Sequence, residues 1–325
     1  MTGLRASACM ALIAVACTTL CPGAMAQEYP TKSIRLVLPY PPGGGTDLQA
    51  RTLAQKLSEN LGQTVVVDNR GGANGALAMA HVAKSAADGY TLVYALPAQF
   101  AVNPALYPRL AYDPIRDFDP VSLVARTPLI LLAHPSVPVK SMAELIRLAK
   151  AKRDDLALAS AGNGSAGHLC LELLKNKSGA QILHVPYKGA GPSLVDLIAG
   201  QAQLSFLAWS TARSFIANGK LRALGLTSAK RVPEIPGIAA IAETLPGYDI
   251  HNWYAIAAPK SVQKQILAKI HAELLRALAA PGLRQSFERE AIEIVGSTPE
   301  FLRDYLQSEL VKWGALVKSS GLKID

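Results

Sequence analysis

The chain has 325 residues, of which 50% are hydrophobic and 18% are charged, and its formal net charge is +9. This length suits one large domain or two medium ones. The basic residues are scattered and are not interleaved with aromatic side chains, which argues against nucleic acid as a partner. The positive charge favours anionic ligands only weakly.

The first 26 residues have the pattern of a removable export signal. Arg5 precedes an apolar stretch over residues 6–20, and Ala24-Met25-Ala26 forms an A-x-A cleavage site before Gln27. The apolar stretch is short for a membrane span. We therefore expect a signal peptide over residues 1–26, cleavage after Ala26, and export to a bacterial periplasm.

The cysteines agree with a soluble exported protein. Only Cys170 remains after cleavage, so no intramolecular disulfide can form. A lipoprotein is the disfavoured alternative, because Leu20 is too large for processing before Cys21, and acylation at Cys17 would leave the apolar run too short. No later apolar run approaches 18 residues, so the mature chain is expected to be soluble.

Strand-like and helix-like segments alternate along the chain and predict an α/β fold with mostly parallel, doubly covered sheets. The candidate strands are residues 33–40, 64–69, 91–96, 156–161, 182–187, 204–209 and 221–228. The candidate helices are residues 74–85, 141–152, 165–178, 192–199, 261–280 and 299–319. In the last helix, an apolar stripe that includes Trp313 is interpreted as core.

The segment PYPPGGGTD, residues 39–47, separates the first strand from a helical pattern. Three glycines let a ligand approach the backbone closely, and Thr46 or Asp47 is predicted to cap the helix. A free helix N-terminus after a strand is an anion site. Nucleotides are excluded, because a Walker A lysine is missing and Leu48 breaks the dinucleotide pattern.

Two further glycine-bearing loops, residues 160–168 and 187–192, also join a strand to a helix. Ligands of open α/β sheets collect at this edge, although each loop alone could be only a tight connection. An enzyme is not predicted: the G-x-S-x-G motif lacks its first glycine, and His168 lies too close to Ser165 on one helix. No spacing indicates a metal site or a cofactor.

Eight segments carry a resemblance to a known family, and together they are highly specific. They are residues 29–47, 61–75, 88–92, 103–125, 134–146, 159–169, 184–204 and 219–231. The chain resembles the Bug/TctC family, the extracytoplasmic solute receptors of tripartite tricarboxylate transporters. The resemblance runs from Tyr29 to the C-terminus.

The resemblance implies a type II periplasmic binding protein with two α/β lobes, a ligand cleft and two crossing hinge strands. We expect lobe 1 over residues 27–126 plus 251–325, and lobe 2 over residues 127–250. The crossing strands are expected at residues 121–134 and 248–258.

The expected ligand-binding residues come from the three loops and one strand end. In the family, backbone N–H groups and waters hold a ligand carboxylate. The candidates here are Tyr40, Gly43, Gly44, Gly45, Thr46, Asp47, Ala161, Gly162, Gly164, Ser165, His168, Lys188, Gly189, Ala208 and Trp209. His168 could equally be a helix residue bonded to a neighbouring loop. Ala208-Trp209 replaces a polar residue of the family, which argues against an ammonium ligand and favours a flat or aromatic body, although Trp209 could simply pack under the hinge.

We therefore predict a monomeric, non-enzymatic receptor that captures a small organic carboxylate, either a di- or tricarboxylate or an aromatic carboxylate. The expected partners are the membrane subunits of a tripartite transporter. One alternative is a ligand sensor for a signalling partner, which the sequence hardly separates from transport. The other, much weaker, is a secreted hydrolase that uses Ser165.

Overall fold

The computed structural model describes residues 29–151 and 156–320. The predicted signal peptide lies outside these residues. The strands are β1 (Ile34–Leu38), β2 (Val65–Asn69), β3 (Thr91–Ala95), β4 (Phe118–Ala133), β5 (Ala157–Ser160), β6 (Leu183–Pro186), β7 (Leu204–Ala208), β8 (Arg222–Leu226), β9 (His251–Pro259) and β10 (Glu293–Ile294).

Helices lie between most of these strands. They are α1 (Gly45–Leu61), α2 (Ala76–Ala83), α3 (Asn103–Leu106), α4 (Met142–Ala151), α5 (Ala166–Ser178), α6 (Ala190–Ile198), α7 (Trp209–Ala217), α8 (Lys264–Leu278), α9 (Pro281–Arg289) and α10 (Pro299–Ser320). Short turns of other helix types occur at η1 (Ala73–Gly75), η2 (Ala98–Val102) and η3 (Ile241–Glu243).

The strands form a sheet of order β2-β1-β3-β9-β4-β7-β5-β6, and β8 and β10 also pair with β4. The strands β1, β2 and β3 are parallel, and so are β5, β6 and β7. Antiparallel pairing is confined to partners of β9 and β4. The predicted α/β class is confirmed, as two parallel groups joined by a long antiparallel pair.

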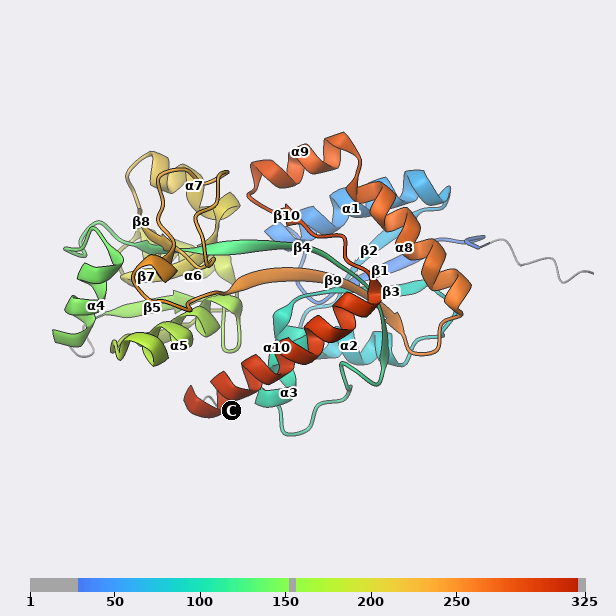
Figure 1. The fold of residues 1–325 in the computed structure, drawn as a ribbon, viewed down its shortest axis with the longest axis horizontal. Coiled ribbons are helices and arrows are strands. Elements are labelled where there is room, and N and C mark those ends of the chain that lie inside the picture. Colours follow the sequence, from blue (N-terminus) through green and yellow to red (C-terminus); the bar gives the residue numbers. More distant parts are fainter. Residues whose placement is uncertain (1–28, 152–155, 321–325) are drawn as a thin grey trace, which may run out of the picture.

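The long strand β4 runs through both groups. Its residues 118–128 pair with β9, its residues 129–133 pair with β7 on one side, and its residues 130–133 pair with β8 on the other. In Figure 1, β4 and β9 cross the middle of the molecule side by side. The two segments expected to cross are therefore strands, while the exact lobe boundaries stay a prediction.

The C-terminal helix α10 packs against both groups. Leu302 and Leu306 belong to one core cluster with Trp253 of β9, whereas Trp313 belongs to another with Leu129 of β4. The Glu309 side chain is buried between them, because its Oε2 accepts from the indole N–H groups of Trp253 at 2.9 Å and Trp313 at 2.8 Å. Trp313 is 1% exposed, which confirms its interpretation as core.

Two local predictions were wrong. The predicted strand over residues 204–209 ends at Ala208, and Trp209 begins helix α7, which was not predicted. The helix predicted over 261–280 spans only Lys264–Leu278, and a separate helix α9 begins at Pro281, a residue suited to the first helical turn. Among the helices of the described ranges, none has the length and hydropathy that crossing a membrane requires.

Candidate ligand-binding site

The glycine loop between β1 and α1 is organised by Asp47. Its Oδ2 accepts hydrogen bonds from the Gly43 amide and from Arg51 Nε, both at 3.0 Å, and its Oδ1 accepts from Asn69 Nδ2 at 2.9 Å. The helix N-cap is Gly44, without a side-chain cap. The predicted cap by Thr46 or Asp47 was therefore wrong, because the Asp47 carboxylate ties the loop to neighbouring groups instead.

The charge of Asp47 is compensated within the loop. Burial alone would raise its pKa, but the hydrogen bonds from Arg51, Gly43 and Asn69 outweigh burial and hold the pKa below its ordinary value. The side chain is 7% exposed. The carboxylate therefore stabilises the loop and uses the Gly43 amide, which leaves the later amides for a ligand.

The amides of Gly44, Gly45 and Thr46 have no hydrogen-bond partner among the described residues. Both glycines are exposed, and Thr46 is half-buried. These N–H groups belong to the first turn of a 17-residue helix, whose dipole adds partial positive charge at this end. The loop can therefore receive an anion without any cationic side chain.

The second loop, between β5 and α5, presents another helix start. Ser165 is the N-cap, and its Oγ accepts from the His168 amide at 3.4 Å. Gly162 and Gly164 have φ of +130° and +72°, conformations that favour glycine. Within the described segments, the amides of Ala166 and Gly167 lack a partner.

His168 supports this second loop. Its Nδ1 accepts from the Gly164 amide at 3.1 Å, and its ring stacks on His184 with centroids 3.6 Å apart. Burial, reinforced by His184 and Lys175, lowers the pKa of His168 to about 3, so the ring is neutral and can accept this bond. Because Nδ1 is used by Gly164, the pair of Ser165 and His168 does not form a nucleophile and base.

The third loop is joined to the second. The Gly189 amide donates to Ala161 O at 3.1 Å, and Lys188 is exposed beside the start of α6. Ala208 is the N-cap of α7, and the half-buried Trp209 packs against the core cluster around Ile130. Stacking of Trp209 on an aromatic ligand stays a prediction.

The loops of the two strand groups approach each other. A Cβ added to Gly45 would lie 3.9 Å from Ser210 Oγ at the start of α7. One added to Gly164 would lie 2.7 Å from Leu106 Cδ1 and 3.1 Å from Asn74 Nδ2. No sequence pattern indicated Ser210 or Asn74 as site residues, although Asn74 stands in the glycine-rich segment of residues 61–75.

Tyr40 lies between the end of β1 and the three glycines of the loop. Its hydroxyl accepts from Gln99 Nε2 at 3.2 Å, and its carbonyl accepts from Asn69 Nδ2 at 3.1 Å. Burial raises the pKa of Tyr40 to about 12. The phenol is therefore a neutral hydrogen-bonding group at physiological pH.

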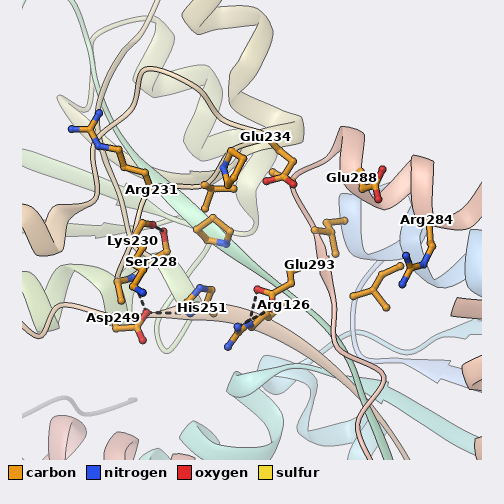
Figure 2. A pocket seen from close by; sticks show the side chains of 17 residues that line it. Arg126, Ser228, Lys230, Arg231, Glu234, Asp249, His251, Arg284, Glu288 and Glu293 are labelled. Atoms are coloured by element: carbon orange, nitrogen blue, oxygen red, sulfur yellow. Dashed lines mark hydrogen bonds and ion pairs between the residues drawn. The ribbon is translucent and has the colours of Figure 1, made fainter. Parts of the chain in front are cut away.

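A separate groove of about 670 Å³ contains none of the predicted site residues. Figure 2 shows its charged side chains, with Arg126 paired to Glu293 and Asp249 to His251. Four acidic and four Lys or Arg side chains line it, so the groove does not select an anion. In the chain as described, no group of three His, Cys, Asp or Glu side chains is arranged to hold a metal ion.

The family model "Tripartite tricarboxylate transporter family receptor" matches residues 49–322. The chain is 36% identical to Protein BugT of Bordetella pertussis over 301 residues, which cover 92% of each chain. The chain belongs to the tripartite tricarboxylate transporter receptor family.

Solved structures of this family have the same fold. The chain is 35% identical to R. palustris Rpa4515 with adipate, with a TM-score of 0.85 over 91% of this chain and 99% of that one. The chain is 31% identical to MatC from Rhodopseudomonas palustris with bound malate, with a TM-score of 0.81 over 89% of this chain and 100% of that one. It is 32% identical to the periplasmic binding protein BugD, with a TM-score of 0.82 over 91% of this chain and 99% of that one. The Bug/TctC prediction is confirmed, and the family consists of receptors rather than enzymes.

Proposed function

We propose that the chain captures a small organic carboxylate in the periplasm and delivers it to the membrane subunits of a tripartite tricarboxylate transporter. One observation carries the proposal: at the starts of α1 and α5, at the carboxyl edges of the two strand groups, stand amides that have no partner among the described residues. A carboxylate offers about four lone-pair sites, which suits several N–H donors and a helix dipole. Among the solved relatives, Rpa4515 is described with adipate and MatC with bound malate, and both of these ligands are carboxylates.

The capture step uses two lobes, residues 27–126 plus 251–325 and residues 127–250, with β4 and β9 as the hinge. The close approach of the loops supports a closed arrangement of these lobes: a Cβ added to Gly45 would lie 3.9 Å from Ser210 Oγ, and one added to Gly164 would lie 2.7 Å from Leu106 Cδ1. The mature receptor begins at Gln27 and acts as a monomer. A di- or tricarboxylate or an aromatic carboxylate is the ligand.

A thermal-shift screen of organic acids tests the capture step. A ligand at 100 times its Kd stabilises the protein by about 2.7 kcal/mol, which a melting curve detects easily. The uncharged amide of each active acid is the matched control and is expected to give no shift. If no organic acid stabilises the protein, or acid and amide act equally, carboxylate capture is refuted.

Uptake of the labelled acid by cells with and without this chain tests delivery. Uptake should depend on the chain and on both membrane subunits. Binding in vitro without any effect on uptake would contradict the transport role while leaving capture intact.

A further inference from the structure

Two buried polar atoms beside the glycine loop have no hydrogen-bond partner among the described residues: Tyr94 OH and Gln49 Oε1. Tyr94 is fully buried and is the penultimate residue of β3. Gln49 lies on α1, one turn after Gly45. A buried polar atom without a partner destabilises a protein, so these two atoms are expected to serve a group that arrives from outside the chain.

A second tyrosine, Tyr254, contacts both Tyr94 and Gln49. The rings of Tyr94 and Tyr254 stack with centroids 5.6 Å apart and an interplanar angle of 7°. They stand on paired antiparallel strands and belong to the same core cluster, so both side chains lie on the same face of the sheet. Tyr254 OH accepts from Gln49 Nε2 at 3.4 Å and from Asn252 Nδ2 at 3.3 Å. Its own proton then remains available for donation.

The three side chains lie next to the candidate site. Tyr94 stands near the carboxyl end of β3, and Gln49 extends from the first turns of α1, the helix whose free amides form the anion site. Tyr40, which precedes the glycine loop, is close enough for Tyr254 to contribute to raising its pKa. Burial also raises the pKa of Tyr94 and of Tyr254, so both phenols keep their protons at physiological pH.

We infer that Tyr94, Tyr254 and Gln49 form the inner end of the ligand site and hold a hydroxyl group of the ligand. A hydroxyl oxygen accepts two hydrogen bonds and donates one, which matches two phenol donors and the carbonyl oxygen of Gln49. A carboxylate placed there would direct negative oxygens at Gln49 Oε1. The inference rests on the proposed function and narrows it to a hydroxycarboxylate, with the carboxylate at the helix amides.

Such a site discriminates strongly, because a ligand without the hydroxyl leaves buried polar atoms unpaired. Calorimetry with two matched pairs, malate against succinate and 4-hydroxybenzoate against benzoate, tests this. In at least one pair the hydroxylated member should bind at least tenfold more tightly. Tyr94→Phe and Gln49→Met should abolish that preference by weakening the binding of the hydroxylated member at least tenfold.

Tyr248→Phe is the matched control, because the Tyr248 phenol is equally buried but donates to Cys170 O at 2.8 Å. It should lower the thermal midpoint and preserve the hydroxyl preference. Tyr94→Phe should not lower the midpoint of the ligand-free protein, since the Tyr94 hydroxyl has no hydrogen bond to any described residue. The thermal midpoint of the ligand-free Tyr94→Phe protein therefore shows whether the Tyr94 hydroxyl has only a structural role.

The outcomes separate the two proposals. If carboxylates bind but neither hydroxylated member is preferred, or if the preference survives Tyr94→Phe, the hydroxyl site is refuted and carboxylate capture stands. If Tyr94→Phe destabilises the free protein as Tyr248→Phe does, its hydroxyl is not available for a ligand. If no carboxylate binds to the parent protein, both proposals fail.

Discussion

Replacing Gly164 by alanine should weaken ligand binding by pushing the two strand groups apart. The added Cβ would lie 2.7 Å from Leu106 Cδ1 and 3.1 Å from Asn74 Nδ2, whereas carbon atoms prefer about 3.5–4.0 Å. Leu106 is 6% exposed, and Asn74 Nδ2 is held by Asn103 Oδ1 at 2.9 Å, so neither can move away freely. The contact therefore requires a shift of roughly 1 Å between the loops.

The loss of ligand affinity in Gly164→Ala can be separated from the loss of stability that backbone strain causes. Gly164 has φ of +72°, where alanine costs roughly 1 kcal/mol. Gly219 has the same φ, but a Cβ there would meet no atom of residues 29–151 or 156–320 within 4 Å, so Gly219→Ala carries the strain alone. Both variants should lose the stability that backbone strain costs, and only Gly164→Ala should also lose affinity, by tenfold or more, about 1.4 kcal/mol.

Calorimetry with the best acid from the screen measures the affinity, and solution scattering measures the radius of gyration. Ligand should reduce the radius of the Gly219→Ala protein and should reduce that of Gly164→Ala less. Equal affinities for the two variants would refute the reasoning that closure across Gly164 accompanies binding.

Three further predictions concern substitutions of single residues. Gly44→Val should preserve the fold, since a Cβ there meets nothing within 4 Å in the part of the chain that the structure describes. It should lower carboxylate affinity at least tenfold by calorimetry, and unchanged affinity would mean that the glycines serve only the turn. Asp47→Ala should lower the free energy of unfolding by about 1–3 kcal/mol, because three donors lose their acceptor, and a loss near zero in urea titrations would contradict its role as the tether of the loop. The free energy of unfolding should fall as the pH drops from about 6.5 towards 3, because His168 gains a proton near its ordinary pKa of 6.5 in the unfolded chain, while the folded ring, with a pKa of about 3, stays neutral. His168→Asn should make the free energy of unfolding depend less on pH over this range. An unchanged pH dependence in this variant would contradict the lowered pKa of His168.

The glycine loop could be predicted from the sequence because its signal is local. An apolar strand, three glycines and an amphipathic helix follow one another without interruption, and each dictates its own backbone. The role of Asp47 in holding the loop could not be predicted from local sequence. Its partners include Asn69, which lies 22 residues away, and its burial depends on how the next strand packs.

Contacts between the strand groups could not be predicted from local patterns. Ser210 meets the glycine loop only because β7 passes directly into α7 at Trp209, without a glycine or proline to mark the change. Tyr94 occupies an inward position of a strand and therefore looks like ordinary core. Its hydroxyl lacks a partner among the described residues because of how the neighbouring strand and α1 pack around it, and only the folded structure brings these elements together.

A crystal structure of the complex with the tightest-binding acid from the screen tests the central claim most directly. The claim predicts a ligand carboxylate whose oxygens lie about 2.7–3.2 Å from the amide nitrogens of Gly44, Gly45 or Thr46, between these amides and the start of α5. A ligand bound in the groove of Figure 2, or a carboxylate held by a Lys or Arg side chain with the glycine-loop amides left to water, would contradict it.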